Sequence, residues 1–337
     1  MKSILGIGNA LTDILAIVPN DGWLAKFHLP KGSMQHVDGA TGNKIWAELK
    51  TLGVQYVPGG SAANTIAGTS IFGMPSGFIG KVGEDELGSL FKAAQENNGI
   101  KTNLLKGDKP SGRSMVFVTK ENQERTFAVY LGSALDLVAE DLKPEFFQGY
   151  DYFHIEGYLV QNQNLVRRAV KYAKEAGCMI SLDMASYNVV ESNDAFLHDI
   201  VEKYVDIVFA NETEAKSFTK MEPEKACEEI AKMCDIAVVK LGPDGSLVRR
   251  GNEVYRIKPW PATRVDATGA GDIYAAGFLY GHSLGLPIEA CGKIGSIISA
   301  KVVEVIGPKV DVPRWKAAKQ EIRELIASYG ISEQTSK

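Results

Sequence analysis

The sequence predicts an α/β protein with a mostly parallel central sheet. From Tyr150 onward, short apolar runs of strand length alternate with amphipathic segments of helix length. This alternation is typical of right-handed strand–helix–strand crossovers, in which helices cover a parallel sheet. The chain of 337 residues can bury a sizeable core, and it shows no internal repeat or low-complexity linker. We therefore expect one compact domain.

The N-terminal part begins with a buried strand and continues into a segment rich in chain breakers. Ile4–Gly8 is the predicted strand, and a loop carries Asn9 and Asp13 beyond its carboxyl end. Ligands of open α/β sheets bind at that end of the strands. Prolines and glycines interrupt residues 14–56, so we expect an irregular lid or edge segment with a short helix around Asn43–Leu52.

A glycine pair then precedes a predicted helix. Gly59 and Gly60 allow a backbone to approach a ligand, and Ser61 is the expected N-cap of a helix that runs through Ile71. The next predicted elements are a strand (Phe78–Val82), a helix that Asp85 caps and that runs to Asn97, and a β-hairpin (Ser114–Thr119 with Arg125–Tyr130).

The second half supplies the regular alternation. Its predicted strands are Tyr152–Ile155, Met179–Leu182, Ile207–Phe209, Ile236–Lys240 and Glu253–Ile257. Its predicted helices are Gln163–Ala176, Asn193–Lys203, Pro223–Met233, Ile288–Val305 and Val312–Tyr329. The stretch Ile288–Ile306 carries charged residues, so we interpret it as a core helix and not as a membrane span.

Two acids bracket a glycine-rich turn in the stretch RVDATGAGD. Asp266 precedes the turn, Asp272 follows it, and an apolar run at helical spacing comes next. The free amides of Gly269, Ala270 and Gly271 at this helix start form an anion site. A lone first-turn acid usually only complements the helix dipole. Here the pattern favours phosphoryl transfer, in which the amides hold the phosphoryl group and Asp272 takes the proton from the attacking hydroxyl.

These residues resemble the signatures of the PfkB, or ribokinase-like, family of sugar and nucleoside kinases. DATGAGD, ending at Asp272, is similar to the family's Asp-Thr-x-Gly-Ala-Gly-Asp, with Ala267 where Thr is common. Gly59–Asn64 supplies the family's N-terminal Gly-Gly-x-x-x-Asn element. The resemblance implies a ribokinase-like three-layer sandwich, with a mostly parallel central sheet and a small β lid. It also implies an ATP-dependent kinase.

The resemblance further implies how the chain is divided. It predicts a single kinase domain over residues 1–330, with the lid contributed by about 14–56 and 108–132, and a loose tail at 331–337. Members of the family dimerise through lid strands or remain monomeric. The hydrophobic face of Ser114–Tyr130 suits either arrangement, so a homodimer through the lid is one expectation.

Five residues match family positions that bind the phosphate acceptor. Asp13 is expected to accept hydrogen bonds from two substrate hydroxyls, whereas sequence alone also allows ordinary capping roles for Asp13 and Asn64. The full substrate-binding set that the resemblance implies is Asn9, Leu11, Asp13, Gly60 and Asn64.

Metal sites are expected at two places. Asn211 and Glu214 match an Asn-x-x-Glu element that holds Mg²⁺ through water, although the same spacing is that of a helix capping box. Mg²⁺ is required because the oxygens of ATP must be neutralised, and it keeps several waters in such sites. Asp266 lies where family members place a loop that binds a monovalent cation, which makes K⁺ a candidate cofactor.

Nucleotide binding is expected at the turn after Ile236–Lys240 and at the glycine-rich motif. Gly242 and Gly245 match a Thr-x-Gly-x-x-Gly element that lines the nucleotide, with Lys240 in place of Thr. A plain Pro-Asp-Gly turn explains most of this stretch equally well. Asn211 and Thr268 complete the predicted nucleotide-binding set.

Several segments resemble the adenosine-kinase branch of the family: GIGNALTDI, FHIEGYLV and VDIVFANETEA. A nucleoside needs an apolar slot for its base, and the candidates are Leu11, Met34, Phe117, Phe127, Tyr130 and Tyr158, which are equally typical of core positions. We expect transfer to a primary hydroxyl of adenosine or a related nucleoside. A sugar (ribose, fructose or a keto-deoxy sugar acid) is the alternative, and it would use Asp13 and Asn64 without that slot.

Composition and missing motifs argue against other classes. The net charge of −4 gives no general reason to bind nucleic acid or a membrane. The cysteines form no CxxC pair, and Gly8, Asn9 and Asp13 interrupt the apolar N-terminus, so we expect a cytoplasmic protein without a signal peptide. Gly6-x-Gly8 lacks the third glycine of a dehydrogenase, the GxxxxGK[ST] loop is absent, and the presence of Asp272 disfavours a silent sensor. The five histidines have no metal-ligand spacing.

Overall fold

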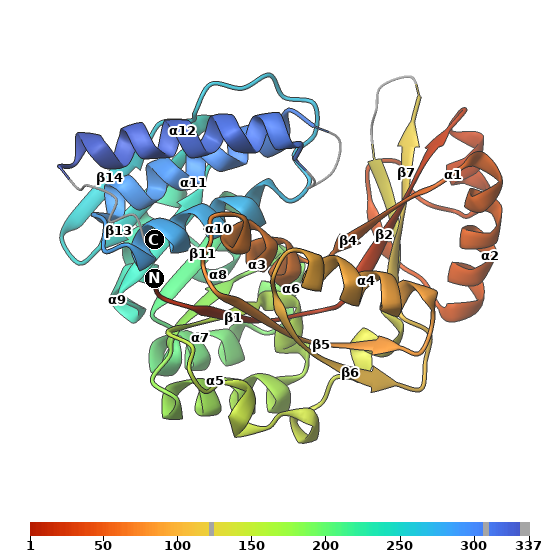
Figure 1. The fold of residues 1–337 in the computed structure, drawn as a ribbon, viewed down its shortest axis with the longest axis horizontal. Coiled ribbons are helices and arrows are strands. Elements are labelled where there is room, and N and C mark those ends of the chain that lie inside the picture. Colours follow the sequence, from red (N-terminus) through yellow and green to blue (C-terminus); the bar gives the residue numbers. More distant parts are fainter. Residues whose placement is uncertain (121–124, 306–309, 331–337) are drawn as a thin grey trace.

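The protein is described from a computed structural model that covers residues 1–120, 125–305 and 310–330. The predicted hairpin turn at Glu121–Glu124 and the tail 331–337 lie outside these ranges. The main body is built on a nine-stranded sheet in the order β14-β13-β12-β11-β10-β9-β1-β5-β6 (Figure 1). Its strands are β1 (Ile4–Ile7), β5 (Ser76–Gly83), β6 (Lys101–Gly107), β9 (Tyr152–Glu156), β10 (Met179–Asp183), β11 (Ile207–Asn211), β12 (Ile236–Lys240), β13 (Ser246–Arg250) and β14 (Glu253–Ile257).

The sheet is parallel from β6 to β12, β13 pairs antiparallel with β12, and β14 pairs antiparallel with β13. Helices cover both faces, which confirms the predicted three-layer α/β sandwich. One apolar core joins the sheet to α3 (Ser61–Ile71), α4 (Glu86–Asn97), α10 (Ala270–Ser283), α11 (Ile288–Val303) and α12 (Val312–Ser328). A second core lies under α5 (Gln163–Glu175), α6 (Tyr187–Ser192), α7 (Asp194–Tyr204), α8 (Glu212–Thr219) and α9 (Pro223–Met233).

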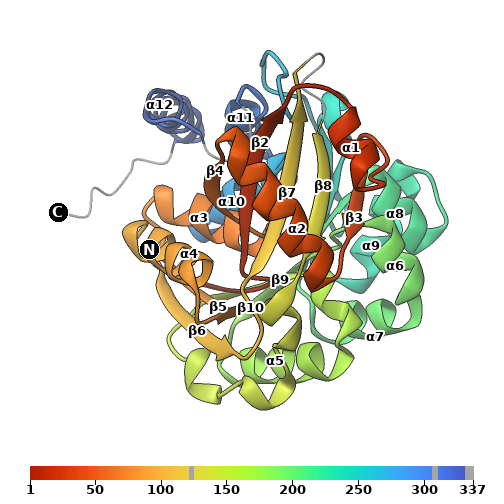
Figure 2. The same ribbon diagram turned by 90° about the vertical axis from the view of Figure 1, so that its right-hand side faces the viewer.

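A smaller five-stranded sheet stands beside this body, in the order β3-β8-β7-β2-β4 (Figure 2). Its strands are β2 (Leu11–Val18), β3 (Met34–His36), β4 (Gln55–Gly59), β7 (Gly112–Thr119) and β8 (Arg125–Tyr130). The predicted hairpin is confirmed, because β7 and β8 pair antiparallel. The expectation that residues 14–56 are irregular is wrong. Pro19, Pro30 and Gly32 fall between short elements, whereas Gly22, Gly39 and Gly42 lie within the helices Gly22–Lys26 and Gly39–Leu49.

The outer face of the small sheet is covered by two helices of the same segment, α1 (Gly22–Lys26) and α2 (Gly39–Leu49). Their side chains form a separate apolar core with those of the sheet, in which Phe27 packs against Phe117 with ring centroids 6.1 Å apart. One apolar face of the hairpin is therefore buried within the chain.

Local signals at helix starts succeed in one place and fail in another. Asp85 caps α4 as predicted, since its carboxylate accepts a hydrogen bond from the Gly88 N–H at 2.9 Å. Ser61 does not cap α3: Gly60 is the N-cap, with φ of 100°, and Ser61 is the first helical residue. Its hydroxyl has a partner elsewhere, as the site shows.

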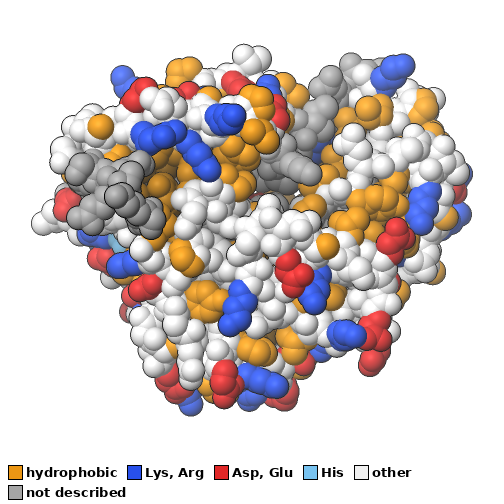
Figure 3. Space-filling view, in the orientation of Figure 1, with side chains coloured by type: hydrophobic (Ala, Val, Ile, Leu, Met, Phe, Trp, Pro, Cys, Tyr) orange, Lys and Arg blue, Asp and Glu red, His pale blue; other side chains and the backbone are white. Residues whose placement is uncertain are grey.

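The distribution of charge on the surface and the character of the helices agree with the balanced composition of the sequence. Figure 3 shows basic and acidic side chains interspersed over one face of the molecule, without a large area of one sign. None of the helices in the described ranges has the length and apolar character that a membrane crossing requires.

Candidate active site

A pocket of about 1180 Å³ lies between the small sheet and the carboxyl ends of the central strands. Strands β9 to β12 deliver polar residues to one wall, and β2, β3 and β8 of the small sheet deliver mainly apolar ones to the other. The first turn of α10 closes the polar end. This is the edge of an α/β sheet at which ligands usually bind.

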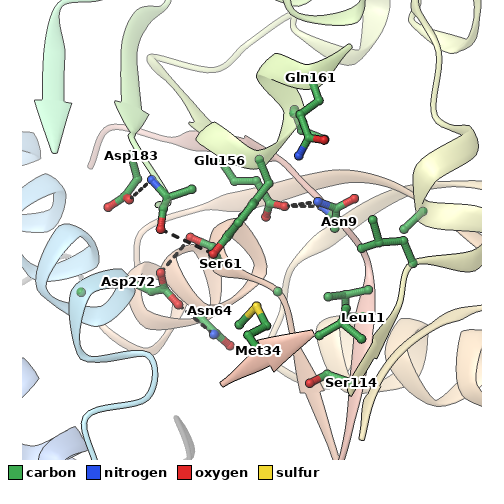
Figure 4. A pocket seen from close by; sticks show the side chains of 18 of the residues that line it. Asn9, Leu11, Met34, Ser61, Asn64, Ser114, Glu156, Gln161, Asp183 and Asp272 are labelled. Carbon is green, nitrogen blue, oxygen red and sulfur yellow. Dashed lines mark hydrogen bonds between the residues drawn. The ribbon is translucent and has the colours of Figure 1, made fainter. Parts of the chain in front are cut away.

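Asp272 lies in the first turn of α10 and faces the pocket (Figure 4). One carboxylate oxygen accepts a hydrogen bond from the Ser61 hydroxyl at 2.8 Å, and the other accepts one from the Asn64 side-chain amide at 2.9 Å. Burial, and then the negative charge of Asp183, raise the pKa of Asp272 to about 7. The two hydrogen bonds lower it by less, so this carboxyl group is poised to exchange a proton near neutral pH.

The amides beside Asp272 form an anion site that differs in one member from the predicted one. Gly269 is the N-cap of α10, with φ of 75°, a conformation that suits glycine. Among the described residues, the N–H groups of Gly269 and Gly271 have no hydrogen-bond partner, and both residues line the pocket. Ala270 does not belong to this set, because its N–H donates to the Ala267 carbonyl at 3.2 Å.

Glu156, at the end of β9, is a site residue that the sequence analysis missed. Its side chain is buried, and it accepts hydrogen bonds from the Asn9 backbone N–H at 3.0 Å, from the Asn9 side-chain amide and from the Ala62 N–H at 3.1 Å. Burial raises the pKa of Glu156 to about 7. This one carboxyl group thus fixes both the loop that carries Asn9 and the first turn of α3.

Asp13 lies on β2 at the side of the pocket that the small sheet forms. Burial raises its pKa to about 6, while a hydrogen bond from Ser114 and the positive charge of Arg125 oppose the rise. The two glycines at the end of β4, Gly59 and Gly60, are required by close approach. A Cβ on Gly59 would lie 2.6 Å from an Asp13 carboxylate oxygen, and one on Gly60 would lie 2.3 Å from the Asn9 carbonyl oxygen.

Lys240, at the end of β12, is paired with Asp183 at the end of β10. Their charged atoms are 2.7 Å apart, and the side chains are 14% and 7% exposed. Asn211 and Glu214 start α8 beside them, and each satisfies the other in the capping box that the sequence allowed. Burial and the charge of Asp183 raise the pKa of Glu214 to about 7. Both Glu214 oxygens already accept hydrogen bonds from Asn211, so they would hold a Mg²⁺ ion only through its waters, and such a cation would relieve that repulsion.

Asp266, the predicted monovalent-cation residue, is held by protein groups. One carboxylate oxygen accepts the N–H and the hydroxyl of Thr268, at 3.0 and 2.9 Å. The other pairs with Arg125 of β8 at 2.9 Å, and both side chains are nearly buried. Both oxygens are therefore engaged, and no role for K⁺ is derived from this carboxylate. Within the described part of the chain, no cluster of three or more His, Cys, Asp and Glu side chains has a metal-binding arrangement.

Residues 47–315 match the model of the pfkB family carbohydrate kinases. The chain belongs to this family. It is 30% identical over 249 residues to an uncharacterized sugar kinase of Archaeoglobus fulgidus, an alignment that covers 73% of this chain and 98% of that relative. It is 28% identical over 290 residues to the 5-dehydro-2-deoxygluconokinase of Clostridium beijerinckii, covering 81% of this chain and 86% of the relative.

The similar solved structures include both an adenosine kinase and a probable sugar kinase. The adenosine kinase of Sinorhizobium meliloti superposes with a TM-score of 0.85 and 32% identity, covering 95% of this chain and 99% of the other. A probable sugar kinase of Rhizobium etli superposes with a TM-score of 0.86, also at 32% identity, covering 96% and 99%. The ribokinase-like fold and the phosphotransferase class are thus established, and the substrate is a separate question.

The remaining predicted residues of the kinase separate into two groups. Gly242 and Thr268 line the pocket, as do four members of the predicted base slot: Leu11, Met34, Phe127 and Tyr158. The others lie outside the lining. Gly245 is a turn glycine whose Cβ would lie 1.9 Å from the Ile257 carbonyl oxygen, Phe117 belongs to the core under α1 and α2, and the Tyr130 ring packs against Arg113.

Proposed function

We propose that this kinase transfers the γ-phosphoryl group of ATP to a primary hydroxyl of a nucleoside, with adenosine the favoured acceptor. The observation that carries the proposal is Asp272. It is a partly buried carboxylate with a pKa of about 7, fixed by two side chains of α3 and set beside free amides at a helix N-terminus. A general base and a phosphoryl-binding site are thus adjacent, which is what this reaction requires.

The residues of the pocket divide the reaction between them. Asp13 and Asn9 bind hydroxyls of the acceptor and turn its reacting oxygen toward Asp272. That oxygen bonds to the γ-phosphorus while the bond to the β,γ-bridging oxygen breaks, ADP leaves with the bridging oxygen, and Asp272 takes the proton. The amides of Gly269 and Gly271 stabilise the charge on the phosphoryl oxygens. Mg²⁺ bound with ATP would neutralise phosphate charge, and Asn211 and Glu214 would hold it through water.

Two features of the pocket favour a nucleoside over a sugar acid. The wall that the small sheet contributes is apolar, and Figure 4 shows Leu11 well separated from Asp272, as a base and a reacting hydroxyl would be. In addition, Lys240 is the only lysine or arginine among the described residues that line the pocket, and it is already paired with Asp183. A carboxylate on the acceptor would therefore find no free cation, whereas a neutral base would find an apolar surface.

A sugar is the second candidate, and the curated relatives favour it. The Clostridium beijerinckii enzyme is named a 5-dehydro-2-deoxygluconokinase, and the Archaeoglobus fulgidus relative is named an uncharacterized sugar kinase. Asp13 and Asn9 would serve sugar hydroxyls as well as those of a ribose. Because the reaction uses ATP, we place it in the cytoplasm.

A thermal-shift screen with purified protein, Mg²⁺ and a non-hydrolysable ATP analogue tests this choice. A ligand that binds only the folded state stabilises it, by about 2.7 kcal/mol at a hundredfold excess over Kd. The melting temperature therefore rises with the ligand concentration. We expect adenosine or another nucleoside to give the largest shift, and ADP release to confirm turnover. Shifts with ribose, fructose or a keto-deoxy sugar acid alone would reverse the ranking.

A further inference from the structure

We propose that Lys240, oriented by Asp183, is a built-in cation that binds the phosphoryl group of the nucleotide during transfer. The inference rests on the proposed function, and it adds the ammonium of Lys240 to the groups that hold the phosphoryl group. Strand β11 separates the two residues in the sheet, so the side chains reach across one strand to meet at 2.7 Å. Both residues line the pocket.

The charge of the pocket wall shows why a cation is needed. The described lining residues include six carboxylates against one lysine: Asp13, Glu156, Asp183, Glu212, Glu214 and Asp272. ATP is itself a polyanion, so this wall would repel the reacting phosphates without local positive charge. The amides of α10 supply partial charges, and Lys240 supplies the one full positive charge that a lysine or arginine of the described lining offers.

Lys240 lies against the predicted phosphoryl site. A Cβ on Gly271 would be 3.1 Å from the Lys240 Nζ, so the ammonium packs on the first turn of α10 where a side chain would obstruct it. The free N–H of Gly271 and the ammonium of Lys240 are thus close enough to contact one anion together. A lysine binds a phosphate as a point charge, which suits an anion that changes shape during transfer.

Asp183 fixes the direction of the ammonium. One of its carboxylate oxygens accepts the N–H of Ala185 at 3.0 Å, and the other accepts a hydrogen bond from Lys240. An ammonium has three donors, so two remain for phosphoryl oxygens. Burial lowers the pKa of Lys240, but Asp183 and Glu214 outweigh it and keep the pKa above its ordinary value, so the cation persists at neutral pH.

The stability of the fold does not account for the pair. Replacing a buried ion pair by apolar residues is often neutral or stabilising, and this pair faces a pocket and not the core. The chain offers a matched comparison: Lys81 and Asp141 are 2.8 Å apart, with side chains 12% and 19% exposed, and neither residue lines the pocket.

Lys240→Met tests the proposal, with Lys81→Met as the control for loss of a half-buried lysine. We expect Lys240→Met to lower kcat/KM for ATP by about 10²–10³, in the range found when one donor to a developing anion is removed. The KM of the acceptor should change little, and Lys240→Arg should recover part of the activity. If Lys240→Met fails to fold because Asp183 is left unpaired, the double variant Asp183→Asn/Lys240→Met replaces it. The double variant should show the same loss of kcat/KM for ATP.

Thermal protection by AMP-PNP with Mg²⁺ gives a readout that does not depend on the acceptor. We expect AMP-PNP to protect the wild type and Lys81→Met equally and Lys240→Met much less. Equal protection of all three, or a kcat/KM for ATP in Lys240→Met within threefold of wild type, would overturn the role of Lys240. A wild type that AMP-PNP protects but that phosphorylates none of the acceptors would instead count against the proposed function alone.

Discussion

Asp272 owes its raised pKa to the kind of partners it has. Both of its carboxylate oxygens accept hydrogen bonds, but the donors, the Ser61 hydroxyl and the Asn64 amide, are neutral. Neutral donors orient a carboxylate and lower its pKa less than burial raises it. The structure therefore combines fixed geometry with a proton affinity near neutrality, two properties that a general base needs together.

The pH dependence of turnover follows from this carboxyl group. The base works only when deprotonated, so we expect kcat to be low at pH 6, to rise through a pH of about 7 and to level off above pH 8. Steady-state rates with saturating ATP and acceptor measure this profile. The pKa of Asp13 is raised to about 6, so Asp13→Asn is the control for titration of that neighbouring group. This variant should raise the acceptor KM and keep the rise of kcat between pH 6 and 8. A flat kcat profile from pH 5.5 to 8.5 would contradict the assignment.

Residues within the two motifs could be predicted from the sequence, because backbone chemistry links them locally. Asp272 and the glycines around it are one helix start, and their roles follow from free amides and small side chains. Glu156 could not be assigned, because its partners lie on β1's loop and on α3. Its only sequence signal is an acid at the end of the buried strand Tyr152–Glu156.

At the scale of elements, one ion pair ties the small sheet to the body. Arg125 is the first residue of β8, and Asp266 lies in the loop before α10, so their contact joins the small sheet to the loop that leads to Asp272. The pair is nearly buried, so removing one partner leaves an uncompensated buried charge and is costly. We expect it to hold the small sheet over the pocket.

Removal of the charge of Asp266 should loosen this contact. We expect Asp266→Asn to raise hydrogen exchange in β7 and β8 and to raise the acceptor KM more than it lowers kcat, because the small sheet then covers the pocket less of the time. Hydrogen exchange followed by mass spectrometry and steady-state kinetics measure both effects. Asp199→Asn, which breaks the surface pair with Arg167, is the control and should change neither. Unchanged exchange in β7 and β8 of Asp266→Asn would refute the tie.

The predicted helices and strands are correct where the hydrophobic pattern extends over a long segment, and they are wrong or missing where the elements are short. The crossover helices and central strands follow the alternation directly. The local pattern assigns no strand at β6 or β13 and no helix at α6 or α8, and it indicates irregular structure for residues 14–56. In that segment the side chains of α1 and α2 are explained by packing on the small sheet, a tertiary contact that no local pattern contains.

At the scale of the whole molecule, the site exists because two sheets face each other. The central sheet with its two helical layers brings the ends of β9 to β12 and the start of α10 to one edge, and the small sheet closes the other side. The three-layer arrangement could be predicted from the alternation of elements and from the motifs. The covered outer face of the small sheet could not, since it depends on where α1 and α2 fold back.

Product formation by Asp272→Asn tests the central claim most directly. The matched control is Glu86→Gln, because Glu86 is a first-turn acid of α4 outside the pocket. We expect wild type and Glu86→Gln to convert the acceptor from the thermal screen to its monophosphate with one ADP each. Asp272→Asn should lose about 10²–10⁴ in kcat, as for a removed general base, while AMP-PNP and the acceptor still protect it against unfolding. A folded Asp272→Asn protein with kcat within threefold of wild type would contradict the account.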